Sequence, residues 1–257
     1  KRTERYRNLM EAYNNDELKV WEELKRPVKM TVFSYKGDID TTLSPLDSMR
    51  YYKRILNIGM MSMDPTNGHV KAWIGGINYK YFKYDHVKQS RRQPGSTFKP
   101  FVYTAAIDGP KDLSPCYMIK DEPFEIEVEE KGEKKIWRPS NADGTFSYSM
   151  MPLRRALAKS INSVAARLTN EVGADTVMYY AQKMGIKSPL KPVASIGLGS
   201  FDVSLFEMIG AYSAFVNEGI HVEPMLVTEI KDQNGKVIQT FESTATRVIK
   251  KESAQLV

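Results

Sequence analysis

A serine and a lysine three positions apart could form a nucleophile and its base in this chain. They are Ser96 and Lys99, in the string Ser96-Thr97-Phe98-Lys99. On a helix, residues i and i+3 lie one turn apart on the same face, so the hydroxyl could pass its proton to the amine. The same spacing recurs at Ser188 and Lys191. Because serine and lysine are common residues, their surroundings must decide between the two pairs.

The residues around Ser96 predict that it lies at the N-terminus of a helix. Pro94 and Gly95 end an extended segment, and the apolar run 98–107 is compatible with a helix. Backbone N–H groups and the positive end of the helix dipole could stabilise an oxyanion there. That field and desolvation together should lower the pKa of Lys99 from about 10.4 to about 7. On these residues alone, a capping serine beside a surface lysine remains an alternative.

The second pair has loop residues on either side. Ser188 lies between Gly185 and Pro189, and Pro192 follows Lys191. Glycine and proline end regular elements, so we do not expect Ser188 and Lys191 to share a helix face.

Two further polar residues interrupt a run of good helix formers. Ser160 and Asn162 follow the run 153–159, and residues 163–172 return to helical spacing. This pattern predicts a break between two helices, at which both polar groups could face one cleft. The alternative is that they simply cap a helix.

The elements that must position these residues follow the order strands, helices, strands, which predicts an α+β domain. Turn residues between extended segments predict hairpins, helical spacing predicts helices, and Ser204 with Glu207 forms a capping box. The seven acidic residues between Asp121 and Glu133 are expected to form a solvated face. We expect the domain to occupy residues 57–257 and residues 1–56 to be a linker segment. The predicted hairpins span 59–74, 124–137 (turning near Lys131) and 225–241. A further strand is predicted over 30–35, and helices are predicted over 1–25, 45–56, 152–172, 174–184 and 205–217.

Length and composition are those of an ordinary globular chain. The 257 residues carry 37 Lys and Arg against 31 Asp and Glu, and 42% are hydrophobic. These values exclude collagen-like, coiled-coil, disordered and disulfide-scaffold classes. Apolar stretches are far shorter than the ~18 residues that span a bilayer. One cysteine and three scattered histidines predict neither a disulfide nor a metal site, and the dispersed basic excess predicts no nucleic-acid partner.

The residues around Ser96 resemble a known active-site segment. The string Arg92-Gln93-Pro94-Gly95-Ser96-Thr97-Phe98-Lys99-Pro100-Phe101 is similar to the active-serine segment of bifunctional (class A) penicillin-binding proteins. Ser160-Ile161-Asn162 is similar to their second motif, and further similarity runs through residues 63–76, 139–141 and 197–212. The resemblance covers about residues 57–257. It implies the transpeptidase fold shared with serine β-lactamases, an antiparallel sheet with helices.

The resemblance also implies a function, that of a peptidoglycan D,D-transpeptidase. Ser96 would attack the carbonyl between the last two D-alanines of a stem peptide, and neutral Lys99 would take its proton. Ser160 would relay a proton to the departing D-alanine, and Asn162 would hold the substrate amide and help to position Lys99. β-Lactams would acylate the same serine, and no cofactor is needed. The resemblance further implies an upstream glycosyltransferase module and a place at the extracytoplasmic (periplasmic) face of the cytoplasmic membrane, with the anchor outside this chain.

One motif of that family does not occur in the sequence. Lys-Thr-Gly or a relative is absent, and the chain begins at Lys1 without a signal peptide. We therefore expect a piece of a longer protein that is C-terminally incomplete, acylates poorly as it stands, and leaves a sheet edge unpaired and apolar surface uncovered. The alternatives are a serine β-lactamase or penicillin sensor, and a non-catalytic cell-wall scaffold domain.

Overall fold

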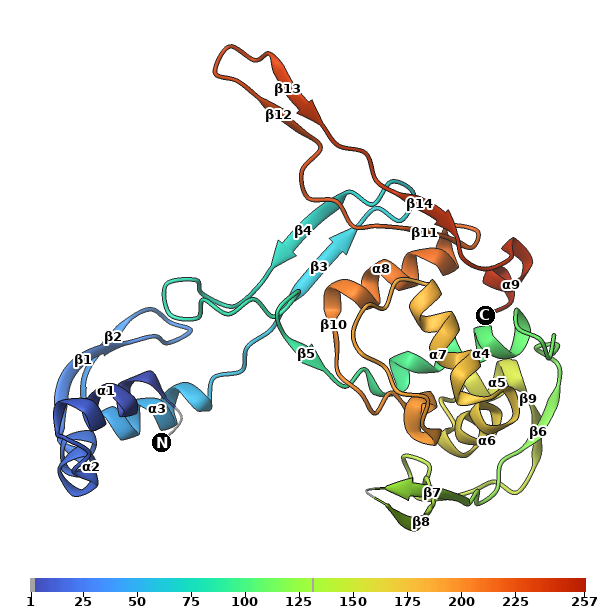
Figure 1. Ribbon diagram of the computed structural model, residues 1–257, viewed down its shortest axis with the longest axis horizontal. Coiled ribbons are helices and arrows are strands. Elements are labelled where there is room, and N and C mark those ends of the chain that lie inside the picture. The colour runs from blue at the N-terminus through green and yellow to red at the C-terminus, as the bar shows by residue number, and fades with distance from the viewer. Residues whose placement is uncertain (1–2, 131) are drawn as a thin grey trace. The chain divides into compact units, whose positions relative to one another are not determined.

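Two units make up the chain in the computed structural model, which describes residues 3–130 and 132–257 (Figure 1). The first unit holds the residues up to Asn57 together with Asn78–Lys83. The second holds Ile58–Ile77 and Tyr84–Val257. The four candidate residues at positions 96, 99, 160 and 162 all belong to the second unit.

The first unit combines three short helices with one antiparallel hairpin. The sequence predicted a single helix over residues 1–25, and this is wrong, because Asn14 and Asn15 take positive φ values of 47° and 64° that a right-handed helix does not allow. Asp16 then caps the second helix by accepting the Lys19 N–H. A linker role for residues 1–56 stays a prediction. The elements are α1 (Glu4–Ala12), α2 (Glu17–Lys25), β1 (Val28–Val32), β2 (Ile39–Leu43) and α3 (Pro45–Lys53).

The helices of the second unit pack around α4 (Lys99–Ile107). Every residue of α4 except Pro100 is buried, as expected for a helix that is apolar on all sides. In Figure 1 this helix lies among α5 (Leu153–Ala158), α6 (Asn162–Val172) and α7 (Ala174–Lys183). The predicted break between two helices is thus present between α5 and α6. The other helices are η1 (Gly95–Phe98), η2 (Ala194–Leu198), α8 (Leu205–Val216) and α9 (Lys251–Leu256).

The named strands of the second unit pair two by two, and every pair is antiparallel. The three predicted hairpins are the pairs β3–β4, β7–β8 and β12–β13, which confirms the α+β class. The predicted turn position Lys131 lies outside the described residues. The strands are β3 (Met60–Met63), β4 (Val70–Ile74), β5 (Arg91–Arg92), β6 (Met118–Lys120), β7 (Ile126–Glu130), β8 (Glu133–Trp137), β9 (Met150–Pro152), β10 (Val203–Ser204), β11 (Ile220–Val222), β12 (Glu229–Lys231), β13 (Val237–Thr240) and β14 (Ala245–Arg247).

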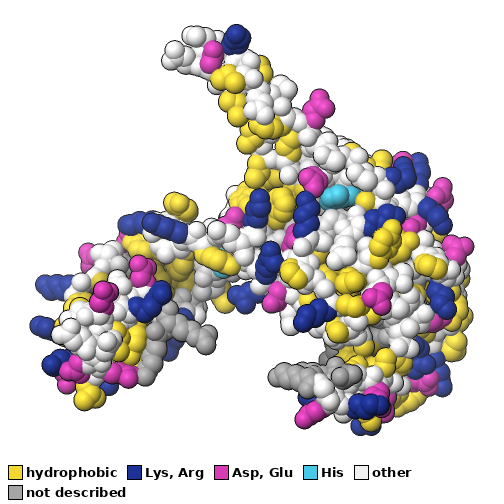
Figure 2. All heavy atoms as spheres, in the orientation of Figure 1, with side chains coloured by type: hydrophobic (Ala, Val, Ile, Leu, Met, Phe, Trp, Pro, Cys, Tyr) yellow, Lys and Arg dark blue, Asp and Glu magenta, His cyan; other side chains and the backbone are white. Residues whose placement is uncertain are grey.

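Charged side chains of both signs are interspersed over the visible face of the second unit (Figure 2). Within residues 3–130 and 132–257, none of the helices has the length and apolar character needed to cross a membrane. The capping box predicted at the start of α8 is present, because the Ser204 hydroxyl accepts the Glu207 N–H and the Glu207 carboxylate accepts the Ser204 N–H.

Candidate active site

Ser96 lies in η1, a single turn of 3₁₀-helix that runs directly into α4. The sequence predicted one helix beginning at this serine, whereas the α-helix itself begins at Lys99, whose N–H donates to the Ser96 carbonyl. Ser96 is exposed, while the Lys99 side chain is buried, with 1% of its surface accessible. A surface lysine beside a capping serine, the alternative considered above, is therefore wrong.

The Lys99 amine is surrounded by three oxygen acceptors. Nζ lies 2.5 Å from the Ser160 carbonyl oxygen, 3.0 Å from Ser160 Oγ and 2.6 Å from Asn162 Oδ1. Burial lowers the pKa of Lys99 to about 8, in the direction that the sequence predicted. The three N–H donors of the ammonium are matched by these three acceptors, and loss of one proton leaves a lone pair beside the Ser160 hydroxyl.

The backbone at Ser160 explains how its carbonyl reaches the amine. The Ser160 N–H donates to Leu157 O at 2.8 Å and the Ile161 N–H donates to Ala156 O at 3.0 Å, which together form a Schellman motif that ends α5. Ser160 takes the left-handed position of this motif, with φ 54°, where glycine is usual. A serine there costs roughly 1 kcal/mol of backbone strain. The turn directs both oxygens of Ser160 toward Lys99.

Asn162 is the first residue of α6, and its side chain is held at both ends. Oδ1 accepts from Lys99, and Nδ2 donates to the Ser140 carbonyl at 2.9 Å. The residue in the N-cap position of α6 is Ile161, which makes no side-chain cap. Neither side chain therefore simply caps a helix, and both polar groups face the Lys99 amine, with the Ser160 hydroxyl within hydrogen-bond reach of Nζ.

Two polar residues behind the site carried no assigned role in the sequence. Asn141 and Asp121 are buried, with 6% and 2% of their surfaces accessible, and Asn141 Nδ2 donates to Asp121 Oδ1 at 2.9 Å. The expectation of a solvated acidic face is thus wrong for Asp121. Its position just after β6 gave no signal of burial, because it belongs by sequence to a run of acidic residues. Asn141 was marked only by its place in the similar segment 139–141.

The turn that carries Ser96 packs closely against Gly199, at the C-terminal end of η2. The Gly95 N–H donates to the Gly199 carbonyl at 3.3 Å, and Gly199 has φ +66°. A Cβ at residue 199 would lie 2.4 Å from the Gly95 carbonyl oxygen and 2.6 Å from its nitrogen. No side chain fits there without moving the turn that carries Ser96.

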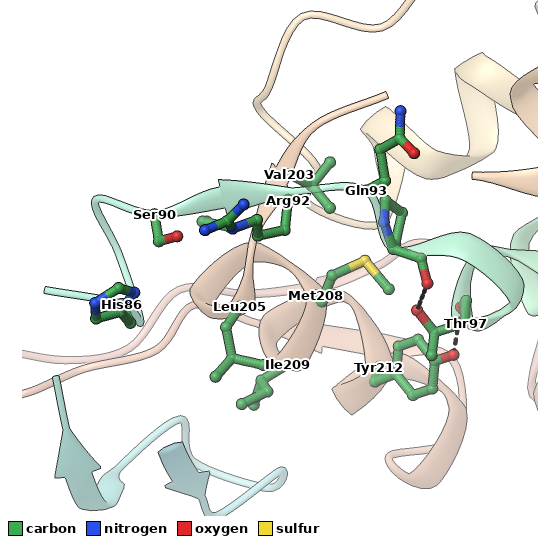
Figure 3. Close-up of a pocket in the computed structure, with 12 residues that line it drawn as sticks. His86, Ser90, Arg92, Gln93, Thr97, Val203, Leu205, Met208, Ile209 and Tyr212 are labelled. Carbon is green, nitrogen blue, oxygen red and sulfur yellow. Dashed lines mark hydrogen bonds between the residues drawn. The ribbon is translucent and has the colours of Figure 1, made fainter. Parts of the chain in front are cut away.

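An apolar groove of about 410 Å³ lies beside the Ser96 turn (Figure 3). Leu205, Met208, Ile209 and Tyr212 of α8 line it together with Arg92 of β5. The Tyr212 hydroxyl donates to the Thr97 carbonyl at 2.5 Å and so connects this helix to η1.

Ser188 and Lys191, the second pair with this spacing, are not arranged as a nucleophile and its base. Ser188 lies in a loop as predicted, and its buried hydroxyl donates to Glu207 Oε2 at 2.7 Å. Lys191 is exposed. Nor do the described residues gather three His, Cys, Asp or Glu side chains that could hold a metal ion. The chemistry that the site can support is acyl transfer from an exposed hydroxyl that lies one turn before a buried amine, and that amine is neutral at mildly alkaline pH.

Comparison with known proteins identifies a matching family over most of the chain. Residues 58–257 match the family described as penicillin binding protein transpeptidase domain, and residues 1–56 match the penicillin-binding protein middle domain. Penicillin-binding protein 1A of Rickettsia felis is 36% identical over 205 residues, which are 79% of this chain and 25% of that protein. The chain spans about a quarter of the length of the curated relatives it matches.

Solved structures agree with this result. The crystal structure of penicillin-binding protein 1A from Haemophilus influenzae has a TM-score of 0.71 and 27% identity, covering 78% of this chain and 34% of that one. The PonA1 protein of Mycobacterium tuberculosis in complex with penicillin V has a TM-score of 0.64 at 24% identity, covering 97% and 66%. The chain belongs to the family of penicillin-binding protein transpeptidase domains.

Proposed function

We propose that this chain carries the acyl-transfer site of a peptidoglycan D,D-transpeptidase, with Ser96 as the nucleophile. The observation that supports this most is the buried Lys99 amine, held by Ser160 and Asn162 and directly preceded by the turn that presents Ser96. A base with a pKa of about 8 is partly neutral at pH 7, and so can accept the proton of a serine hydroxyl. The stem peptide ending in D-alanyl-D-alanine is the proposed substrate.

In the acylation step, a bond forms between Ser96 Oγ and the carbonyl carbon of the penultimate D-alanine. The hydroxyl proton moves to Lys99 Nζ, and the backbone N–H of Ser96 helps to stabilise the oxyanion. The peptide C–N bond then breaks. The proton passes from Nζ through Ser160 Oγ, 3.0 Å away, to the nitrogen of the departing D-alanine.

In the second step, an amine of a neighbouring stem peptide attacks the ester carbonyl. The new C–N bond forms the cross-link, the C–O bond to Ser96 breaks, and the proton that the attacking amine loses passes to Oγ. Water in place of the amine would give carboxypeptidase activity from the same acyl-enzyme. A β-lactam would form an ester with Ser96 in the same way, because its amide would take the place of the peptide bond between the two D-alanines.

We also propose that residues 1–257 on their own acylate slowly. The sequence contains no Lys-Thr-Gly motif, which in the family contributes a substrate-carboxylate contact and one oxyanion donor. Loss of one such donor typically costs about 10² to 10³ in rate. The open groove along α8, next to Thr97, is where we expect that strand to pack. A longer protein that includes the motif should acylate faster, and equal rates would contradict this proposal.

The whole protein is proposed to act at the extracytoplasmic face of the cytoplasmic membrane. Peptidoglycan is cross-linked there, and the relatives share this region as about a quarter of a longer chain. Residues 1–56 would then connect the transpeptidase domain to an upstream glycosyltransferase module.

The test is to incubate the full-length natural protein with benzylpenicillin and to locate the adduct by peptide mass spectrometry. We expect one adduct, on Ser96. Ser96→Ala should abolish it, whereas the matched control Ser188→Ala should keep it. An adduct that persists in Ser96→Ala would overturn the proposal. Rapid release of hydrolysed penicillin would favour a β-lactamase instead.

A further inference from the structure

Asn141 makes four hydrogen bonds that use the whole capacity of its amide. Oδ1 accepts the backbone N–H of Asn162 at 3.0 Å and that of Ser163 at 3.1 Å. Nδ2 donates to Asp121 Oδ1 at 2.9 Å and to the Thr145 carbonyl at 2.8 Å. Both partners of Nδ2 can only accept and both partners of Oδ1 can only donate, so only one orientation of the amide satisfies all four.

Through its oxygen, Asn141 replaces the cap that α6 lacks. The first N–H groups of a helix have no partner within the helix, and Ile161 in the N-cap position offers none. Asn141 supplies an acceptor from a segment 21 residues earlier in the chain. The N-terminus of α6, which begins at Asn162, is therefore held in place by a side chain from outside the helix.

Asp121 fixes the direction in which the Asn141 amide points. Its carboxylate also accepts the Ser163 hydroxyl at 2.7 Å and the Ser147 N–H at 2.8 Å. Burial by itself raises the pKa of Asp121, but hydrogen bonds from Ser147, Ser163 and Asn141 lower it overall, so the group stays ionised at neutral pH. A buried carboxylate needs the Nδ2 donor, and the negative charge is favourable near the start of α6.

The dipeptide 140–141 thus holds Asn162 by both its main chain and its side chain. Asn141 accepts from the Asn162 N–H, and the Ser140 carbonyl accepts from Asn162 Nδ2 at 2.9 Å. With these two contacts made, Asn162 Oδ1 remains for Lys99 Nζ at 2.6 Å. We infer that Asn141, oriented by Asp121, is a positioning residue that fixes Asn162 and, through it, the amine of Lys99. This inference rests on the proposed function, in which that amine is the base.

The test compares Asn141→Ala with wild type in the full-length natural protein, by the rate of acylation with benzylpenicillin from pH 6 to pH 9. We expect the rate to fall by about 10- to 100-fold, the usual effect of a displaced supporting group. We also expect the pH of half-maximal rate to move, because a displaced Asn162 changes both the hydrogen bonding and the desolvation of the Lys99 amine, which together set its pKa. Rates are normalised to the folded fraction.

Asn217→Ala is the matched control, since Asn217 is a half-buried amide that donates to the Ile220 carbonyl at 3.3 Å, away from the site. It should lower the melting temperature without moving the pH profile. The same result for Asn141→Ala would mean that Asn141 only caps α6, and would overturn the inference.

If Asn141→Ala does not fold, Asn141→Asp takes its place. That variant keeps an oxygen for the N–H groups of α6 but, when ionised, cannot donate to Asp121, and we expect it to shift the pH profile as well. Failure of both variants to fold would assign Asn141 to stability alone and overturn the inference. A wild-type protein that is not acylated would instead overturn the proposed function, before any variant of residue 141 is considered.

Discussion

Replacing Lys99 by arginine should abolish most of the acylation while keeping the fold. Arginine retains a positive charge and a long side chain, but its guanidinium stays protonated at every working pH. It can satisfy oxygen acceptors such as the Ser160 carbonyl, yet it cannot accept a proton from Ser96. The variant therefore separates the charge of residue 99 from its basicity.

The size of the effect follows from the pKa of about 8 that burial gives Lys99. At pH 7 about 9% of such an amine is neutral, at pH 6 about 1%, and at pH 9 about 91%. A lysine with the ordinary pKa of 10.5 would be about 0.03% neutral at pH 7, roughly 300-fold less. Because the base acts in its neutral form, the wild-type rate should rise about ninefold from pH 6 to pH 7 and about fivefold from pH 7 to pH 8, and level off above pH 8. Removal of a general base typically costs about 10² to 10⁴ in rate, which we expect for Lys99→Arg.

The assay is the second-order rate constant for acylation by benzylpenicillin, measured from pH 6 to pH 9 in the full-length natural protein. Lys159→Arg is the matched control, because Lys159 is exposed next to the same turn. Its rate and pH profile should equal those of wild type. Circular dichroism and melting temperature check the fold of each variant. Comparable rates in Lys99→Arg and wild type, or a wild-type profile that is flat across this range, would refute the assignment of Lys99 as the base.

Substitutions at three further positions test the site and the elements around it. Ser160→Gly and Ser160→Ala should both slow acylation. Thermal denaturation should show the glycine variant to be more stable than the alanine variant by roughly 1 kcal/mol, because a positive φ strains alanine but not glycine. Gly199→Ala should slow acylation and lower the melting temperature, because its Cβ would overlap the backbone of Gly95; unchanged values for both would contradict the close approach. Burial raises the pKa of Glu207, but hydrogen bonds from Ser204 and Ser188 lower it overall. Its contribution to stability is thus complete above the ordinary pKa of 4.5 and lost as pH falls through the lowered value. In acid titrations monitored by circular dichroism, Glu207→Gln should be less stable than wild type at pH 7, with a smaller difference in acid.

Local signals in the sequence were sufficient for most elements of the fold. The capping residues Ser44 and Ser204 and the turn at Asn234-Gly235 act within a few positions, so the helices and the hairpin that they predict are present. The single helix predicted over residues 1–25 failed because its hydrophobic spacing continues across Asn14 and Asn15, whose side chains tolerate the left-handed conformation that breaks it. Periodicity alone does not detect such a break.

The site itself could be predicted only in part. The spacing of Ser96 and Lys99 and the helix break at Ser160 are local features, and the structure brings Lys99, Ser160 and Asn162 together. The burial of Asp121 could not be foreseen, because it depends on donors that arrive from 20 to 42 positions away. Nothing in the acidic stretch distinguishes the buried Asp121 from the exposed Glu125 and Glu127.

Under the proposed function, the reactivity of Ser96 would be controlled at the junction of α5 and α6 rather than at the serine, because residues of this junction hold the proposed base. Lys99 owes its lowered pKa to burial within α4, and all three acceptors of its amine come from residues 61 or 63 positions further along the chain. The strained turn at Ser160 and the first turn of α6 determine where those oxygens lie. A substitution at this junction can therefore change the pH dependence of acylation while leaving the nucleophile and its own turn intact. A substitution that merely destabilises the domain would reduce the amount of folded protein and leave that pH dependence unchanged.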